Sequence, residues 1–432
     1  MLLAHARLVR SQPSAGQHLT APPSSIQLVF SETPMVAVSR VVLLDARGDT
    51  IPLGPVHVDA ADVHTMLADI TSPLDSGSYA VHWSTAASDG HVSHGSFTFD
   101  VTEPLKQTLP APIHPAQSPS AMKAEGKMET DEVALSYPMM ISRWLGFLAL
   151  FSLVGAVAFK YLVLRKLSRL GQAGDPFDLV ASTGAATFGL FAAVALVIAT
   201  VAKLYGMTMS MSNVSGSTIM LDTGWGWASI AQLAAALLAI VAFRIAHTNK
   251  DSGWSIAAIC AIVVSITPAL TGHAIGSDQA VINVPLDVLH VLAGSVWLGT
   301  LAVIVIVGIG AALKTPGTTS PGTRVAAMIN AFSPIALVCG ATIVTSGIIV
   351  SLLRLHPLRT LWTSGYGKVL ILKLGLVGLL FALGAWNWRR VKPRLTFDEG
   401  LPALRQSARL ELTAGAMVLA VTAFLVAMAL PD

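Results

Sequence analysis

Eight long apolar stretches occupy the chain from about residue 138 to its end, and they limit the possible folds more than any other feature. Each stretch, as a helix, is long enough to cross the ~30 Å hydrocarbon core of a bilayer. Helices can cross lipid because they satisfy their backbone hydrogen bonds internally. We therefore expect residues 137–432 to form an all-α membrane bundle of eight transmembrane helices. The expected spans are 138–164, 179–202, 223–245, 253–272, 285–313, 325–353, 366–389 and 410–430.

The overall composition agrees with a membrane protein, because 53% of the 432 residues are apolar and only 12% are charged. The net charge is +3, and the basic residues flank the apolar stretches instead of alternating with aromatic residues. This pattern excludes nucleic acid as a partner. The two cysteines, Cys260 and Cys339, lie in separate spans and form no CxxC pair. We expect them to be small buried side chains, not a disulfide or a thiolate metal site.

The distribution of Lys and Arg predicts the orientation of the bundle. The connections 165–178, 244–252, 314–324 and 389–409 carry thirteen basic residues, whereas the opposite connections carry four. Cytoplasmic loops are the basic ones. Because eight crossings return the chain to its starting side, both the N-terminal region and the C-terminus are expected outside the cytoplasmic membrane.

An exported N-terminal region requires a signal, and the first four residues are too short to be one. We expect residues 1–4 to be the remnant of a signal peptide that starts further upstream. Cleavage after Ala4 would make His5 the first residue of the mature chain.

Residues 5–101 contain short runs of β-branched and aromatic residues separated by turn signals, which predicts an all-β domain. Strands are expected at 26–30, 36–44, 64–70, 78–83 and 95–101. Apolar and polar residues alternate in the last two, so each has one buried face. A small antiparallel sandwich or barrel of this length can bury a sufficient core without disulfides or metal. The proline-rich and charged residues 102–136 are expected to form an extended, flexible tether.

Asp89, Gly90 and His91 fall in the expected turn between the last two strands. Taken alone, they are ordinary turn residues with a solvated histidine. His5 changes this interpretation, because the amine and ring of an N-terminal histidine can chelate one ion. His91 would add a second imidazole and Asp89 a carboxylate, and such nitrogen-rich coordination suits Cu(II).

Several short motifs cover nearly the whole outer domain. They are Ala4-His5-Ala6, Ser11-x-Pro13-x-x-Gly16, Leu28-x-Phe30-Ser31-Glu32, Gly77-x-Tyr79-x-Val81-x-Trp83 and Ser88-Asp89-Gly90-His91. Together they resemble the periplasmic copper-binding protein CopC. The resemblance implies a Greek-key β-sandwich in which His5, Asp89 and His91 bind Cu(II). The domain has only Met35 and Met66, so we expect no separate Cu(I) site in the sandwich. His94 is interpreted as a surface imidazole.

A second set of motifs resembles the membrane protein CopD over roughly residues 140–430, most strongly from 270 onward. These motifs are Gly272-His273-Ala274, Asp287-x-x-His290, Trp297-x-Gly299, Trp362-x-x-x-Tyr366-Gly367, Lys373, Asn387 and Arg409-x-Glu411. Polar residues inside spans are costly and indicate a transport pathway. His273 and His290 lie toward the outer side, although either could simply satisfy a backbone carbonyl. Lys373 and Glu411 could form a structural pair or a proton route, and the sequence does not choose between them.

Met207, Met209 and Met211 alternate in the outer connection after the second span. Thioether sulfur prefers Cu(I), and an extended strand would direct all three sulfurs to one side. A helix would scatter them and leave ordinary interfacial side chains. We favour a role in copper entry because a Cu(II)-binding domain precedes this segment.

The leading hypothesis is a copper importer of the cytoplasmic membrane. Cu(II) is captured outside by His5, Asp89 and His91, then passes inward, as Cu(II) or Cu(I), by Met207, Met209, Met211, His273 and His290. The expected partners are copper ions, the lipid bilayer and a periplasmic copper donor. No phosphate-binding loop, phosphorylatable aspartyl motif or hydrolase site is evident in the sequence, so an enzyme is not expected. The alternatives are a haem-containing membrane protein that reduces Cu(II), and a copper-handling or copper-sensing protein that does not transport.

Overall fold

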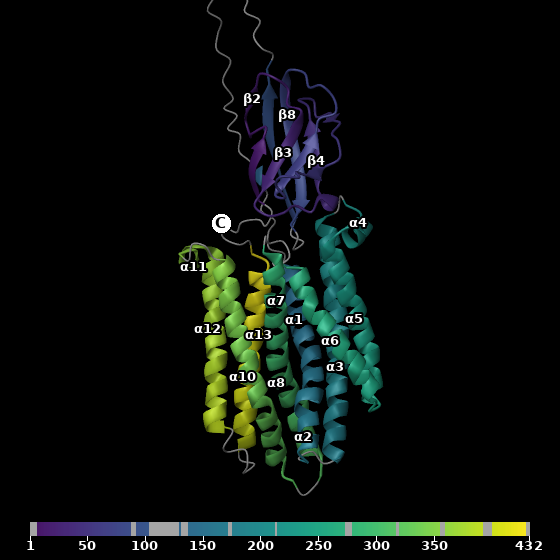
Figure 1. Cartoon of the computed structure of the whole chain (residues 1–432), viewed down its shortest axis with the longest axis vertical. Helices are drawn as coiled ribbons and strands as arrows, with labels where there is room; N and C mark the ends of the chain where they lie inside the picture. The colour runs from purple at the N-terminus through teal and green to yellow at the C-terminus, as the bar shows by residue number, and fades with distance from the viewer. Residues whose placement is uncertain are drawn as a thin grey trace, which may run out of the picture. The chain divides into compact units, whose positions relative to one another are not determined.

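The computed structural model describes residues 7–87, 92–102, 129–130, 137–171, 175–211, 214–272, 279–316, 319–354, 359–391 and 400–428. The chain divides into two compact units. One comprises Leu3–Ala134 and the other Leu135–Asp432, with Met1–Leu2 grouped with the second. The first unit is built of strands and the second of helices (Figure 1).

The strands of the first unit form two sheets. The sheet orders are β1-β3-β7-β6 and β10-β9-β8-β4-β5, and β2 pairs in parallel with β9. The bounds are β1 Leu8–Gln12, β2 His18–Leu19, β3 Ser25–Phe30, β4 Arg40–Leu44, β5 Thr50–Ile51, β6 His57–Val58, β7 Thr65–Asp69, β8 Gly77–Ala86, β9 Val92–Val101 and β10 Glu129–Thr130. The chain changes sheet after β1, β2, β3, β5 and β7, which gives a Greek-key order. The expected all-β sandwich is therefore confirmed.

The inward-facing residues of both sheets form the core of the sandwich. Ile26, Leu28 and Phe30 alternate along β3 and are at most 2% exposed. Phe30 meets Trp83 of β8 edge to face, with 5.2 Å between ring centroids. Burying a large apolar side chain stabilises a fold by about 1.5–3 kcal/mol. The buried face predicted for the last two strands is confirmed, because each of its residues is at most 6% exposed; they are Tyr79, Val81, Trp83, Phe97, Phe99 and Val101.

Two segments differ from the expected pattern. Residues 36–44 do not form one strand, because Val36–Val38 is a 3-10 turn (η1) and β4 begins at Arg40. The Ser39 hydroxyl donates to the Met35 carbonyl at 2.8 Å and closes this turn. Local side-chain bonds of this kind compete with strand pairing. In the expected tether, Glu129–Thr130 pairs with β9 as the short strand β10.

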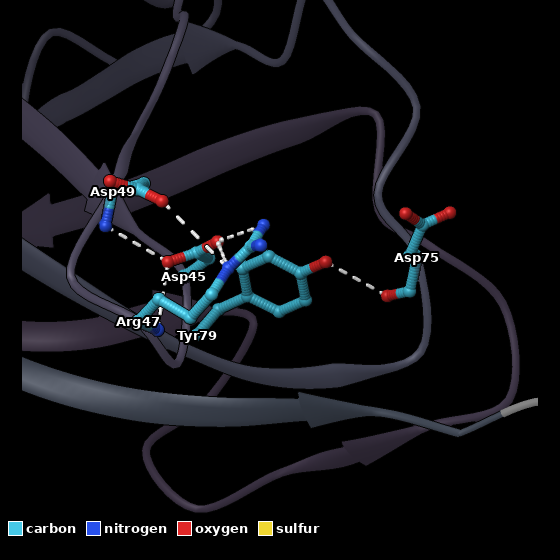
Figure 2. Close-up of polar contacts among 5 residues, drawn as sticks. All are labelled: Asp45, Arg47, Asp49, Asp75 and Tyr79. Carbon is cyan, nitrogen blue, oxygen red and sulfur yellow. Dashed lines mark hydrogen bonds and ion pairs between the residues drawn. The ribbon is translucent and has the colours of Figure 1, made fainter.

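Polar contacts fix two corners of the sandwich (Figure 2). The Tyr79 hydroxyl donates to the Asp75 carbonyl at 2.8 Å, which closes the connection before β8 in the manner of a tyrosine corner. In the β4–β5 turn, Asp45 Oδ1 accepts from the backbone N–H groups of Arg47 and Asp49, each at 2.9 Å. The Asp49 bond is the largest of the contacts that lower the pKa of Asp45 below its usual value.

The second unit contains eight helices long and apolar enough to cross a membrane among the residues described, which confirms the expected number. Its elements are α1 Tyr137–Ala158, η2 Phe159–Leu164, α2 Arg165–Arg169, α3 Asp175–Ser210, α4 Gly216–Leu221, α5 Gly224–His247, α6 Asp251–Leu270, α7 Ala280–Gly294, η3 Ser295–Gly299, α8 Thr300–Val303, η4 Ile304–Gly308, α9 Ile309–Lys314, α10 Pro321–Arg354, α11 Thr360–Thr363, α12 Gly365–Trp386, η5 Asn387–Val391 and α13 Gly400–Leu425. The long helices run side by side, with α4 and α11 at one end and α2 at the other (Figure 1).

The first and fifth spans cross at two glycines. A Cβ atom on Gly155 of α1 would lie 2.1 Å from the Gly299 carbonyl carbon, and one on Gly299 would lie 2.0 Å from the Phe151 carbonyl oxygen. Gly299 ends the π-helical turn η3, and such turns inside α-helices are frequent at functional sites. This backbone contact holds the fifth span, which carries His290, against the centre of the bundle.

Candidate metal sites

The predicted outer ligands Asp89 and His91 fall in residues 88–91, and His5 in residues 1–6, all outside the described residues. Strands β8 and β9 lie on either side of residues 88–91. β8 and β9 remain paired to their ends, where Ala86 faces Val92, and Ala87 forms a bridge with Pro34. The predicted ligands Asp89 and His91 thus belong to the connection of a long hairpin, as expected.

The described residues next to His5 lie at the same edge of the sandwich. Arg7 and Ser31 exchange two hydrogen bonds, since the Arg7 N–H donates to Ser31 Oγ at 3.0 Å and the Ser31 N–H donates to the Arg7 carbonyl at 2.9 Å. Pro34, which bridges to Ala87, follows only three residues later. Three residues span at most about 10 Å. Arg7, two residues after His5, and Ala87, two residues before Asp89, are therefore neighbours.

Buried side chains anchor the stems of this hairpin. Thr85 is fully buried and its hydroxyl lies 2.6 Å from Ser39 Oγ, while Trp83 and Ser93 are 2% and 1% exposed. His94, in contrast, is an exposed residue of β9, as expected for a surface imidazole. No group of three or more His, Cys, Asp or Glu side chains that could hold a metal occurs within the described ranges.

His290 of α7 is held by a hydroxyl from another span. Its Nδ1 lies 2.9 Å from Ser346 Oγ on α10. The Ser346 hydroxyl in turn donates to the Thr342 carbonyl at 2.7 Å. A hydroxyl has one proton to donate. With that proton directed at Thr342, Ser346 accepts from His290 Nδ1–H, and Nε2 carries the lone pair that can bind a metal ion.

His290 lines a cavity of about 610 Å³ within the helical unit. Its polar lining includes Arg143, Lys203, Asp287 and Lys373, and most of its other lining side chains are apolar. Metal-bound histidines generally donate their second ring N–H to an oxygen, which orients the ring. The Ser346 contact gives His290 this arrangement beside an open space. His273, the second predicted histidine, lies outside the described residues.

The predicted methionines lie at the end of a helix, since α3 continues to Ser210. The extended-strand alternative is therefore wrong, and the three sulfurs do not share one face. Met207 and Met211 are 1% and 5% exposed, whereas Met209 is 59% exposed. Residues four apart lie on one side of a helix. Met207 and Met211 thus continue the side of α3 on which Lys203 lines the cavity.

Lys373 and Glu411 do not form a pair. Glu411 Oε1 accepts a hydrogen bond of 2.6 Å from Asn387 Nδ2, and it lies beside Gly384 of α12. Lys373 precedes Gly384 by eleven residues on the same helix, a rise of about 16 Å. Of the two alternatives left by the sequence, the structural pair is thus excluded.

Three families match this chain. The copper resistance protein D family matches residues 326–425, the CopC domain residues 8–102, and the N-terminal domain of copper resistance protein D-like proteins residues 134–281. These matches cover both units in the order in which the chain presents them. The chain is a CopC–CopD fusion.

Relatives of the fusion match either the whole chain or its first unit. Copper transport protein CutJ of Bacillus subtilis (strain 168) is 22% identical over 392 residues, 88% of this chain and 67% of CutJ. Protein YobA of Escherichia coli (strain K12) is 31% identical over 98 residues, 23% of this chain and 79% of YobA. Copper resistance protein C of Xanthomonas campestris pv. juglandis is 30% identical over 103 residues, 23% of this chain and 80% of that protein.

The solved structure of CopC from Methylosinus trichosporium OB3b is 30% identical, and the match covers 24% of this chain and all of that chain, with a TM-score of 0.22. The CopC–CopD fusion is a multi-pass membrane protein of the copper resistance and transport families. His290 lies between the two membrane-family matches, which end at residue 281 and resume at 326.

Sequence reasoning missed the partners of the polar membrane residues. Ser346, which orients His290, lies 56 residues away, and Ser407, which contacts Asn387, was not singled out. Serines within helices commonly donate to the carbonyl four residues earlier, so a serine such as Ser346 does not by itself predict a contact with another span. The two cysteines are free and buried, as expected.

Proposed function

We propose that this CopC–CopD fusion imports copper across the cytoplasmic membrane. Cu(II) is captured outside by His5, Asp89 and His91 and is passed to a membrane pathway that contains His290. The observation that carries the membrane part is the orientation of His290, whose Nε2 is left for a ligand while Nδ1 is held by Ser346. This is the arrangement of an imidazole prepared to bind a metal.

The outer site is supported by the two chain segments that meet at one edge of the sandwich. Arg7 and Ala87 both contact the short stretch from Ser31 to Pro34. An N-terminal amine, two imidazoles and one carboxylate would give the tetragonal coordination that Cu(II) prefers. A copper donor outside the membrane would load this site.

The entrance to the membrane pathway is proposed at the end of α3. Met207 and Met211 are buried on the side of the helix that leads to the cavity, and thioethers prefer Cu(I). Met209 points elsewhere and is an interfacial side chain in this proposal. His273, close in sequence to Thr271 and Gly272 of the cavity lining, would be a second imidazole ligand.

The charge of the cavity argues against a water-filled cation channel. Arg143, Lys203 and Lys373 line it, with Asp287 as the single carboxylate of the described lining. A free copper ion would be repelled by this excess of positive charge. Copper would therefore move by exchange between coordinating side chains, with His290 as the ligand inside the cavity. The more basic connections are placed in the cytoplasm. With this orientation, copper is proposed to move from the outer domain inward.

His290→Ala tests this function. Cells that carry the variant should accumulate less copper, while Cu(II) binding by the outer domain is unchanged. His82→Ala, which removes an exposed imidazole of β8, is the matched control and should leave uptake unchanged. Undiminished uptake in His290→Ala would exclude the pathway. Copper flux into or out of sealed vesicles gives the direction, and a haem band in the visible spectrum of the purified protein would favour a redox function instead.

A further inference from the structure

Glu411 is a buried carboxyl group that the copper pathway does not use. It lies in the eighth span, on α13, and is 6% exposed. In the described part of the chain it forms one side-chain hydrogen bond, from Asn387 Nδ2 to Oε1, and no ion pair. An isolated carboxylate in a membrane interior is strongly disfavoured. The group therefore needs a proton or a cation to be stable where it lies.

The neighbouring polar atoms suit a proton better than a metal ion. Ser407 Oγ donates to Asn387 Oδ1, and the Asn387 amide donates to Glu411. The amide oxygen is thus engaged, and Oε2 of Glu411 is the acceptor left in this chain of hydrogen bonds. A metal ion requires several ligands, whereas one carboxylate oxygen binds a proton completely. Ser407 is half-buried, so the chain leads from the buried carboxyl group toward the surface.

Charged groups on the surrounding elements do not neutralise Glu411. Lys373 of α12 and Arg143 of α1 line the cavity, and Lys368 of α12 is exposed. The remaining cations of α13 and the adjoining turn η5 are exposed, except for the half-buried Arg405; they are Arg389, Arg390, Arg405 and Arg409. Within the described residues, none of these cations pairs with the Glu411 carboxylate.

An apolar layer separates Glu411 from the cavity. Trp297, Leu298, Leu380 and Val418 line the cavity and pack together, and we call them the cavity floor. Trp297 also stacks on Phe381, with 5.2 Å between ring centroids. Glu411 precedes Val418 by seven residues on α13, a rise of about 10 Å. It therefore lies beyond the floor, on the side away from His290.

We propose that Glu411 is a proton-binding site beyond the cavity floor that couples copper movement to the movement of a proton. This inference rests on the proposed copper transport. Oε2 takes up one proton from the side of the floor on which Ser407 lies. It releases that proton into the cavity when the floor side chains move apart, and no electron is transferred. The buried carboxyl group is neutral when protonated and gains one negative charge when the proton leaves. Copper held at His290, on the other side of the floor, favours that charge.

The full-length protein in sealed vesicles tests the coupling. With the wild type, added copper should change the internal pH, and an imposed pH gradient should drive copper accumulation. Glu411→Gln keeps an acceptor for Asn387 but cannot exchange a proton, so both effects should be lost while downhill copper flux persists. Ser333→Ala removes a hydroxyl that donates only within α10, to the Ile329 carbonyl, and should keep both effects. Retention of pH-driven accumulation in Glu411→Gln would overturn the proposal.

Infrared spectroscopy tests protonation independently of transport. The wild-type protein in lipid should show the carbonyl band of a protonated carboxyl group that disappears as pH rises, and Glu411→Gln should lack this band. Absence of a band that differs between the two proteins would overturn the proposal even if copper transport is demonstrated. If the band is present but no copper crosses the membrane, the transport function fails and the proton site remains. Matching elution profiles of the two proteins in detergent would confirm that the variant folds.

Discussion

Single neighbouring side chains decide what the polar residues of the membrane unit can do. His290 Nδ1 lies 2.9 Å from Ser346 Oγ, and with the Ser346 proton directed at the Thr342 carbonyl, Nε2 carries the lone pair. Glu411 could pair with a lysine, but Asn387 occupies it instead. In both cases the neighbour, and not the ionisable residue itself, determines which atom is available for copper or for a proton.

Removing the Ser346 hydroxyl should weaken copper binding in the membrane unit. Loss of the oxygen that orients a metal-binding histidine typically lowers metal affinity by about 10–100-fold. We expect an effect of this order for Ser346→Ala, measured by copper titration of the full-length protein in which His91 is replaced by alanine. Ser333→Ala is the control, because that hydroxyl donates only within α10, to the Ile329 carbonyl. Equal affinities for the two variants would contradict the proposed role of Ser346.

Asp45 should make the outer domain less stable in acid. Its folded-state pKa lies below the usual value of 3.8, so ionisation favours the folded domain at neutral pH. This contribution is complete above about pH 4 and is lost as pH falls through the folded-state pKa. Asp45→Asn should lower the denaturation midpoint at pH 7, and the difference from the wild type should shrink in acid. Asp49→Asn, which leaves the turn hydrogen bonds to Asp45 in place, should change the midpoint less.

Elements of the bundle are positioned by close contacts that apolar composition does not specify. The first and fifth spans touch backbone to backbone at Gly155 and Gly299. The connection between α9 and α10 is closed by Arg324, which is 7% exposed and donates to the carbonyls of Ala312, Thr315 and Pro316. These contacts fix the rotation and separation of helices that would otherwise be free to slide in lipid.

Gly155→Ala should destabilise the bundle. The added methyl group would overlap the Gly299 backbone, and overpacking of this kind costs about 1–3 kcal/mol. Gly146→Ala on the same helix is the control, because its methyl group would lie 3.7 Å from Ala199, an ordinary contact. The thermal denaturation temperature in detergent should fall for the first variant only. A similar fall for both variants would show that the loss of stability does not depend on the contact between Gly155 and Gly299.

Arg324→Lys should loosen the α9–α10 connection. A lysine cannot reach three carbonyl oxygens with a planar group, and each lost hydrogen bond to a charged donor is worth about 1.5–3 kcal/mol. We expect lower thermal stability and faster proteolysis near residue 316. Lys314→Ala, at an exposed cation of the same connection, should have little effect. Unchanged proteolysis in Arg324→Lys would show that the carbonyl contacts are dispensable.

On the scale of the molecule, each compact unit has a hydrophobic core of its own. A sandwich with its own core needs no membrane to fold. The expected order of a metal-binding domain followed by a helical bundle agrees with the two units and with the family matches. The predicted copper ligands of the outer domain, His5, Asp89 and His91, lie outside the described residues.

The outer domain should therefore fold alone and bind Cu(II). We expect residues 5–102 to give a soluble domain whose affinity depends on His5 being the first residue. Placing one residue before His5 removes the chelating amine and should weaken Cu(II) binding at least about tenfold, or about 1.4 kcal/mol. Isothermal titration measures both forms. Equal affinities would exclude the amine as a ligand.

The sequence by itself determined the eight spans, the sandwich and the buried face of its two longest strands, β8 and β9. These follow from local hydrophobicity and from the alternation of side chains along a strand, which need no distant contacts. It failed at Met207 and Met211, where a helix replaces the strand that alternate spacing suggested. Three methionines at alternate positions can occur in a strand or in a helix, and only the observed length of α3 shows that they lie in a helix.

Only the tertiary structure decided which polar residues meet. Ser346 reaches His290, and Asn387 reaches Glu411, because the spans are rotated so that these side chains face each other. The spans are apolar on most of their surface, so composition does not fix their rotation in lipid. Packing at contacts such as Gly155 with Gly299 does so instead. The sequence thus placed a histidine and a carboxyl group in the membrane, and packing between distant helices gave each its partner.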